Sequence, residues 1–303
     1  MSASDVNGLS ESMMTLGSDY RLVLEGGWRL WLHSERWDQG LWPEILRHLA
    51  EQAPSRHPGT RRFHYSRGAA REELFLKVYY RWELFGCIKD LFRDSRAFRA
   101  LRQGLALTGY GFHAPPAIAA GEERRLGLLK RAFLLTAGVP GLPLDQFLRE
   151  RFAAGLNAEA LRRKRRQIEQ LAREIRRMHR LGFVHGDLVP SNILLRVEQE
   201  GIQFFYMDND RTRLYPPWFP HRLWKRNLVQ LNRFVLPGIS LQDRMRFLRA
   251  YLGQASLAKD PRRLLRWLER KTRQRRRECE QIAARVSFRE LMRWDGPFSN
   301  NIR

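Results

Sequence analysis

Residues 184–195 read VHGDLVPSNILL, and this stretch decides the fold class. It opens on an apolar residue and closes in a strand-like run, so its polar centre is expected to form a loop on a rigid base. The loop carries His185, Asp187 and Asn192, with the asparagine five residues after the aspartate. A second acidic cluster, Asp208-Asn209-Asp210, follows the next strand-like run. The sequence therefore predicts two polar loops, each supported by a β-strand.

Loops of this composition fit the transfer of a phosphoryl group from ATP. That reaction needs a carboxylate that orients the attacking hydroxyl, oxygen ligands that hold magnesium, and a cation on the phosphates. Asp187 is the candidate for the catalytic carboxylate, and Asn192 and Asp208 are the candidate metal ligands. Lys77, inside the apolar run LFLKV at 74–78, is the candidate cation.

The pattern H-x-D-x-x-x-x-N, followed by a strand and an aspartate, resembles the protein-kinase-like superfamily. Other stretches resemble the Kdo/WaaP lipopolysaccharide kinase family more narrowly: FLKVYY at 75–80, DSRAFRAL at 94–101, HRLGFVHGDLVPSNILL at 179–195, MDNDRTRL at 207–214 and DRMRFLRAYL at 243–252. The resemblance covers roughly residues 55–252. It implies a two-lobed α+β kinase fold, with a small strand-rich lobe at 20–136 and a helical lobe at 137–255.

The same resemblance implies an activity and a place for it. The expected reaction uses ATP and Mg²⁺ to phosphorylate a sugar hydroxyl of the lipopolysaccharide inner core or of a related glycolipid. ATP is expected near the hinge at 134–138, with Lys77, Gly59 and Thr136 as nucleotide contacts. The expected location is cytoplasmic, peripheral at the inner face of the cytoplasmic membrane.

Several positions depart from the family of protein kinases. The glycine-rich phosphate loop is reduced to the single Gly59, and Gly186 stands where protein kinases have an arginine. The helix expected to supply a glutamate to Lys77 carries SRAFR at 95–99, which leaves Asp94 and Glu83 as alternative partners. Asp210 is either a second metal ligand or the ion-pair partner of a neighbouring arginine, Arg211 or Arg213.

Composition narrows the class of protein. The 303 residues include 43% hydrophobic and 11% aromatic residues, which excludes disorder for most of the chain. Two cysteines exclude both a disulfide framework and a four-cysteine zinc site. No apolar run is long enough to span a membrane, and residues 1–19 have the small, polar character of a loose leader rather than of a signal peptide.

Periodicity predicts how the chain is organised. Strands are expected at 20–25 and 28–32 around Gly26-Gly27, at 61–66, at 74–80, and as two strands or one bent strand at 126–136. Helices are expected at 41–50, 82–107, 144–152, 161–181, 223–234, 241–252 and 261–284, and a hairpin at 193–207.

Charge predicts an anionic partner. Lys and Arg number 55 against 32 Asp and Glu, a formal net charge of +23, and residues 262–277 contain nine of these basic residues. The basic extension at 256–303 is either a helix packed on the second lobe with a solvated face, or an interfacial helix on an anionic membrane surface. Nucleic acid is the less favoured partner because no nucleic-acid-binding motif accompanies the charge.

Two other functions remain open from the sequence. The chain is a kinase of a protein or of a small-molecule acceptor, or it is a catalytically weak kinase-fold scaffold with a basic binding surface. The presence of Asp187, Asn192 and Asp208 favours an enzyme, and the missing partner glutamate of Lys77 favours the scaffold.

Overall fold

The computed structural model describes most of the chain and divides it into two compact units. The described residues are 19–53, 58–68, 70–80, 94–152, 155–198, 201–216, 222–234, 236, 238–253 and 260–285. Unit 1 comprises Met1–Pro140 and Phe205–Thr212, and unit 2 comprises Gly141–Phe204 and Arg213–Arg303. The leader predicted at 1–19 lies outside the described residues except for Asp19, and so does the part of the predicted extension beyond 285.

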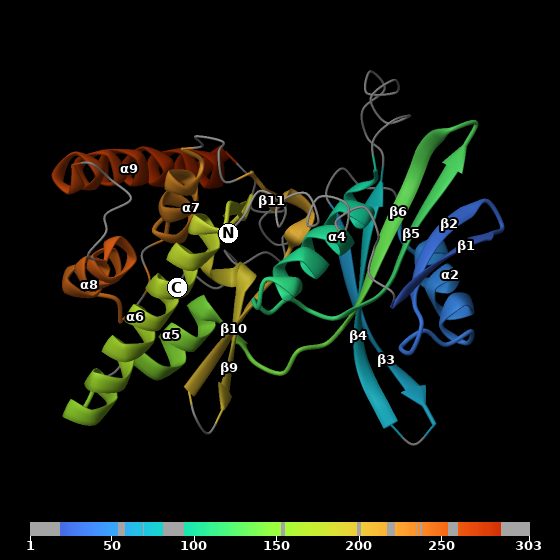
Figure 1. Ribbon diagram of the computed structural model, residues 1–303, viewed down its shortest axis with the longest axis horizontal. Helices are drawn as coiled ribbons and strands as arrows, with labels where there is room; N and C mark the ends of the chain where they lie inside the picture. The colour runs from blue at the N-terminus through green and yellow to red at the C-terminus, as the bar shows by residue number, and fades with distance from the viewer. Residues whose placement is uncertain are drawn as a thin grey trace, which may run out of the picture. The chain divides into compact units, whose positions relative to one another are not determined.

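Unit 1 is built on a six-stranded antiparallel sheet (Figure 1). Its strands are β1 (Tyr20–Glu25), β2 (Trp28–His33), β3 (Gly59–Arg67), β4 (Ala70–Tyr80), β5 (Ala117–Arg125) and β6 (Leu128–Ala137). They lie in the order β1-β2-β5-β6-β4-β3, which places β4, with Lys77, between β3 and β6.

Among the described residues, one helix covers each face of this sheet (Figure 1). Leu41, Ile45 and Leu49 of α2 (Leu41–Glu51) pack on the face that carries Leu76 and Val78. The helix α4 (Arg96–Gly109) packs on the other face through apolar residues that include Phe98 and Leu101. Because side chains alternate along a strand, Lys77 and Tyr79 point to the face that α4 covers.

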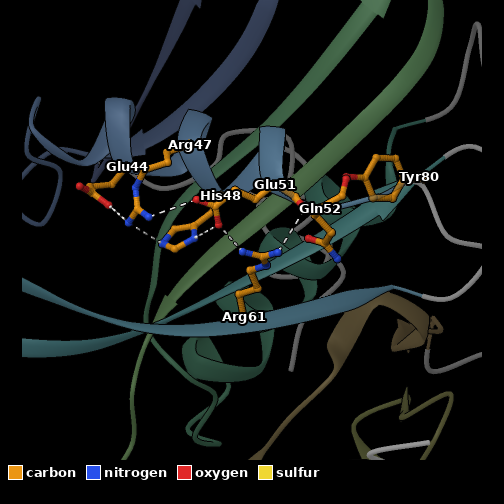
Figure 2. Close-up of polar contacts among 7 residues, drawn as sticks. All are labelled: Glu44, Arg47, His48, Glu51, Gln52, Arg61 and Tyr80. Atoms are coloured by element: carbon orange, nitrogen blue, oxygen red, sulfur yellow. Dashed lines mark hydrogen bonds and ion pairs between the residues drawn. The ribbon is translucent and has the colours of Figure 1, made fainter. Parts of the chain in front are cut away.

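Polar contacts fix the C-terminal end of α2 against β3 and β4 (Figure 2). Glu51 accepts hydrogen bonds from Arg47 of its own helix and from Arg61 of β3, the latter at 2.6 Å. The hydroxyl of Tyr80 donates to the backbone carbonyl of Gln52 at 2.8 Å. The guanidinium of Arg61 lowers the pKa of Glu51, so this carboxylate stays charged. These contacts hold the C-terminal end of α2 against the sheet.

Unit 2 is mainly helical. Its helices are α5 (Leu144–Phe152), α6 (Ala158–Arg180), α7 (Trp224–Leu231), α8 (Leu241–Leu252) and α9 (Pro261–Arg285). Short strands complete it: β7 (Leu142–Pro143), β9 (Ile193–Glu198) and β10 (Gly201–Tyr206) form one sheet, and β8 (Phe183–Val184) pairs with β11 (Arg213–Leu214). The end of β10, from Phe205 on, belongs to unit 1. The helix α9 packs against α7 (Figure 1). Leu171 and Ile175 of α6 are buried, as the amphipathic spacing predicts.

The sequence missed one central strand. Residues 117–125, AIAAGEERR, form β5, which pairs with β2 and β6. The segment has a single β-branched residue, Ile118, and no aromatic residue, so its composition does not mark a strand, and the neighbouring strands decide its conformation instead. Its Gly121 lies against Phe133 and Leu30, where a larger residue does not fit. The helix predicted at 82–107 begins at Arg96 within the described residues, and 81–93 lie outside them.

Candidate active site

Lys77 and Asp208 form an ion pair in unit 1. The Lys77 ammonium donates to Oδ1 of Asp208 at 2.5 Å, and the two side chains are 19% and 33% exposed. Lys77 comes from the middle of β4, opposite Thr60 and Leu134 in the sheet. The structure therefore brings the candidate phosphate cation and one candidate metal ligand into direct contact.

Asp210 is held by an arginine that the sequence did not predict. Nε of Arg96, the first residue of α4, donates to Oδ2 of Asp210 at 2.7 Å, and a second guanidinium nitrogen contacts the same oxygen. The Arg96 guanidinium lies 5.1 Å from the centre of the Tyr79 ring. Burial raises the pKa of Asp210, and the negative charge of Asp208 raises it further. The partner of Asp210 is thus Arg96, and neither Arg211 nor Arg213.

The acidic turn itself has a fixed backbone. Asp208 adopts a left-handed conformation, φ 56° and ψ 55°, which aspartate and asparagine tolerate better than most residues. Asn209 is buried; it donates to the Tyr206 carbonyl at 2.8 Å and accepts from the Thr212 hydroxyl at 3.1 Å. The backbone N–H of Tyr206 donates to the carbonyl of His113 at 2.8 Å. Side chain and backbone bonds together define where Asp208 lies.

The carboxylates considered as substitutes for the missing glutamate of Lys77 lie elsewhere. Asp94 forms ion pairs with Arg29, at 3.5 Å, and with Arg102. Glu83 lies outside the described residues. Asp208 is therefore the carboxylate that the described structure pairs with Lys77.

Asp187 and Asn192 lie together in unit 2, on the loop between β8 and β9. The side-chain amide of Asn192 donates to the backbone carbonyl of Asp187 at 2.9 Å, which closes the loop. His185 is fully buried, and its Nδ1 accepts from the backbone N–H of Asp187 at 3.3 Å. These bonds make the loop a defined support for the Asp187 carboxylate.

Two amide side chains of α7 hold this loop, and sequence reasoning missed both. Oδ1 of Asn227 accepts from the backbone N–H of His185 at 3.1 Å, and its Nδ2 donates to the His185 carbonyl. Gln230 donates to the Gly186 carbonyl at 2.9 Å and accepts from the backbone N–H of Leu188 at 3.2 Å. The two residues lie three positions apart, and therefore on one face of the helix. This spacing is the only feature of the sequence that could have indicated their shared role.

A buried histidine extends the network behind α7. Nε2 of His179 lies 3.0 Å from Oδ1 of Asn227, and its Nδ1 lies 2.8 Å from the Tyr251 hydroxyl. Burial raises the pKa of Tyr251 well above its ordinary value, so the hydroxyl stays protonated. His179 of α6, which is itself bonded to Tyr251 of α8, therefore holds the Asn227 side chain that supports the loop.

The other two predicted nucleotide contacts lie on the sheet of unit 1. Thr136 is in β6, opposite Phe75 and Ala117. Gly59 is the first residue of β3, opposite Val78, and a Cβ at this position would overlap the side-chain amide of Gln52. A larger residue at this position would therefore require the end of the Gln52 side chain to move. Residues 54–57, just before it, lie outside the described residues.

The predicted site residues fall into two groups. Lys77, Asp208, Gly59 and Thr136 belong to unit 1, whereas Asp187 and Asn192 belong to unit 2. Among the described residues, no three His, Cys, Asp or Glu side chains gather closely enough to hold a metal ion by themselves.

Comparison with known proteins agrees with the resemblance in the sequence. The family model of the lipopolysaccharide kinase (Kdo/WaaP) family matches residues 48–251. A solved structure of WaaP in complex with acyl carrier protein is similar to the chain, with 24% identity, a TM-score of 0.55, and coverage of 84% of this chain and 99% of that one. A double mutant of the PknI kinase domain from Mycobacterium tuberculosis matches with 14% identity and a TM-score of 0.37, over 84% and 96% of the two chains. No curated protein sequence matches the chain.

The prediction of fold class is confirmed. The strand-rich unit 1 and the helical unit 2 give the α+β composition that was expected, and the similarity to the WaaP structure shows the fold. Within the part of the chain that the structure describes, no helix is both long and apolar enough to cross a membrane.

Proposed function

Because the chain belongs to the lipopolysaccharide kinase (Kdo/WaaP) family, we propose that it transfers a phosphoryl group from ATP to a sugar hydroxyl of the lipopolysaccharide inner core or of a related glycolipid. Membership makes the chain a phosphotransferase that acts on a sugar hydroxyl. The observation that carries the proposal is the 2.5 Å contact between Lys77 and Asp208, which joins two groups that phosphoryl transfer requires.

The proposed roles follow from chemistry. Asp187 orients the acceptor hydroxyl and accepts its proton, while Asn192 and Asp208 hold Mg²⁺ and Lys77 contacts the phosphates. A carboxylate and an amide oxygen suit Mg²⁺, which ordinarily keeps phosphate oxygens and water as its other ligands. When MgATP binds, Mg²⁺ would replace Lys77 as the positive charge beside Asp208, and the phosphates would replace Asp208 as the negative charge beside Lys77. Gly59 and Thr136 are proposed to lie beside the nucleotide.

We also propose bounds for the two lobes of the kinase. We place the N-lobe at 20–136, the C-lobe at 137–255 and the basic extension at 256–303. The acceptor is tested by mass spectrometry of lipopolysaccharide from a strain that lacks this protein. Loss of one phosphate, restored by the wild-type chain and not by Asp187→Asn, is expected; an unchanged phosphate content would overturn the proposed acceptor.

The basic face of α9 favours a negatively charged membrane surface. Leu264 and Leu268 are buried, and five of the exposed arginines lie on the opposite side of the helix: Arg262, Arg266, Arg270, Arg273 and Arg277. Basic residues near anionic lipid contribute about 1 kcal/mol each. The proposed location is therefore peripheral, at the inner face of the cytoplasmic membrane, where a glycolipid acceptor is available.

Vesicles test this location. We expect binding to anionic vesicles that weakens between about 0.05 and 0.5 M salt, since the Debye length falls from about 14 to about 4 Å. Changing Arg266, Arg270 and Arg273 to Gln is expected to weaken binding more than the single control Arg276→Gln, because Arg276 bonds the carbonyls of Asn232 and Arg233. Tight binding to duplex DNA or RNA with no binding to vesicles would contradict the membrane surface.

An acyl carrier protein is a second proposed partner. The solved WaaP structure is a complex with acyl carrier protein, and unit 2 of this chain has a partly open, largely apolar cavity of about 610 Å³. Its lining includes Phe147, Leu171, Leu236, Leu248 and Leu268. A largely apolar cavity of this volume suits a fatty acyl chain.

The partner is tested with acylated and unacylated carrier protein. The acylated form is expected to bind more tightly, and Leu171→Arg is expected to remove the difference by placing a charge in the cavity. Equal binding of the two forms to the wild-type chain would contradict a role for the cavity.

A further inference from the structure

Opposite charges alternate across the acidic turn of unit 1. Lys77 on β4 pairs with Asp208, and Arg96 on α4 pairs with Asp210 two residues later. Both cations also lie over the Tyr79 ring, at 5.5 Å for Lys77 and 5.1 Å for Arg96. The turn is therefore held from two elements, a strand and a helix.

The first turn of α4, which carries Arg96, is itself fixed. Ser95 caps the helix by accepting from the backbone N–H of Phe98 at 3.2 Å. The backbone N–H of Ser95 donates to Glu122, which is fully buried in β5. Arg29 and Arg124 pair with Glu122 at 2.9 and 2.8 Å. This cluster holds the start of the helix, and with it the guanidinium of Arg96.

Asp210 is far less accessible than its neighbour. Its side chain is 1% exposed, whereas that of Asp208 is 33% exposed. A buried carboxylate requires a partner, and Arg96 supplies two nitrogens to one of its oxygens. Asp208 is the more exposed of the two carboxylates and so the better placed to meet a ligand.

We propose that Arg96 is a positioning residue which, by clamping Asp210, sets the turn so that Asp208 meets the metal, and that Asp210 is the anchor of this clamp rather than a metal ligand. The proposal rests on the proposed function, because it deepens the metal site assigned there. The sequence predicts that this helix supplies an acidic partner for Lys77. The helix α4 instead supplies a cation, Arg96, which pairs with the acidic turn.

The experiment compares Arg96→Gln, Arg96→Lys, Asp210→Asn and the double variant Arg96→Gln/Asp210→Asn. ATP binding is measured by titration with and without magnesium, and kcat and KM for MgATP are measured with the full chain. Arg96→Gln is expected to weaken MgATP binding about 10- to 100-fold, since it leaves a buried carboxylate without its ionic partner. Binding of magnesium-free ATP is expected to change much less.

The double variant separates an anchor from a ligand. Asp210→Asn removes the buried charge, so the double variant is expected to recover most of the magnesium-dependent affinity that Arg96→Gln loses. Arg96→Lys keeps the charge and is expected to lie between the wild type and Arg96→Gln. A double variant as weak as Asp208→Ala would overturn the inference and assign Asp210 as a ligand.

A control on the same helix is Arg102→Gln, because Arg102 pairs with Asp94 and not with the acidic turn. It is expected to bind MgATP as the wild type does. If the wild-type chain showed no magnesium-dependent binding, the proposed function would fail. If the wild type bound MgATP and Arg96→Gln bound it equally well, only the role of Arg96 would fail.

Discussion

The two polar loops are held in different ways. In unit 1 the acidic turn at 208–210 is held by ion pairs from Lys77 and Arg96. In unit 2 the loop that carries Asp187 is held by neutral amides, since Asn227 and Gln230 bond its backbone. Neither amide touches the Asp187 carboxylate in these bonds, because within the loop both reach only main-chain atoms.

The difference matches what each loop is proposed to do. An ion pair between partly exposed groups responds to a charged ligand, because an arriving cation and anion can replace both partners. Neutral bonds to the backbone respond little to charge or salt, and they fix geometry while the carboxylate stays available. If the proposed roles hold, the acidic turn is expected to respond to metal and nucleotide, and the loop that carries Asp187 is not.

The largest effect is expected from Asp187→Asn, which removes the carboxylate and keeps its shape. Turnover should fall by about 10²- to 10⁴-fold, the usual contribution of a general base. ATP binding should stay near the wild-type value, because the loop backbone is held by α7 and not by this side chain. Single-turnover kinetics and ATP titration measure the two quantities; near-normal turnover would refute the assignment of Asp187.

Asp208→Ala is expected to act on binding instead. It removes a proposed metal ligand and the partner of Lys77, so magnesium-dependent nucleotide affinity should fall about 10- to 100-fold. Asp210→Ala should have the smaller effect on this affinity. Titrations of nucleotide with and without magnesium test the order, and a reversed order would move the metal site to Asp210.

Asn227→Leu replaces one neutral side chain by another and is expected to destabilise unit 2. It removes hydrogen bonds to both backbone groups of His185 and to His179, and a buried polar group that loses its bond costs about 1–3 kcal/mol. The free energy of unfolding should fall by about 3 kcal/mol, equally at low and high salt. Urea unfolding measures it, with Asn232→Ala, at the C-cap of the same helix, as the control. A loss of stability that varied strongly with salt would contradict the conclusion that uncharged hydrogen bonds hold this loop.

The sequence predicted the fold wherever a pattern was local. The helices α5, α6, α8 and α9 begin and end within a few residues of the predicted bounds, because each has a long apolar stripe. β5 was missed, since its neighbours in the sheet and not its own composition make it a strand. Residues of this kind are defined by tertiary contacts.

The same reason explains the candidate site. Asp187 and Asn192 lie on one short loop, so their spacing revealed them. Arg96 reaches a residue 114 positions away and Asn227 one 42 positions away, and no local pattern predicts such contacts. Asp94 was a reasonable substitute partner for Lys77 by position, but arginines of its own unit already pair with it.

The smallest effect concerns a buried ion pair of unit 2 and its dependence on pH. Lys164 donates to Asp243 at 2.6 Å, and Ser240 and Asp243 form a capping box at the start of α8. Burial alone would raise the pKa of Asp243, but hydrogen bonds from Lys164 and Ser240 outweigh it, and the pKa is lowered. Arg246, at 3.3 Å, adds a second positive charge.

The pKa of Asp243 is lower in the folded chain than its ordinary value of 3.8 in the unfolded chain. Asp243 therefore stabilises the fold fully at pH values above 3.8, and it loses this contribution as the pH falls through the pKa of the folded chain. Urea unfolding of the wild type and Asp243→Asn between pH 3 and pH 6 should show a difference that is constant at the upper end and shrinks below about pH 3.8. The neutral asparagine cannot titrate, so the variant supplies its own baseline. A difference that stayed constant to pH 3, or that grew, would show that Asp243 does not stabilise unit 2 through its charge, and the contrast between charged and neutral support would then apply to the acidic turn alone.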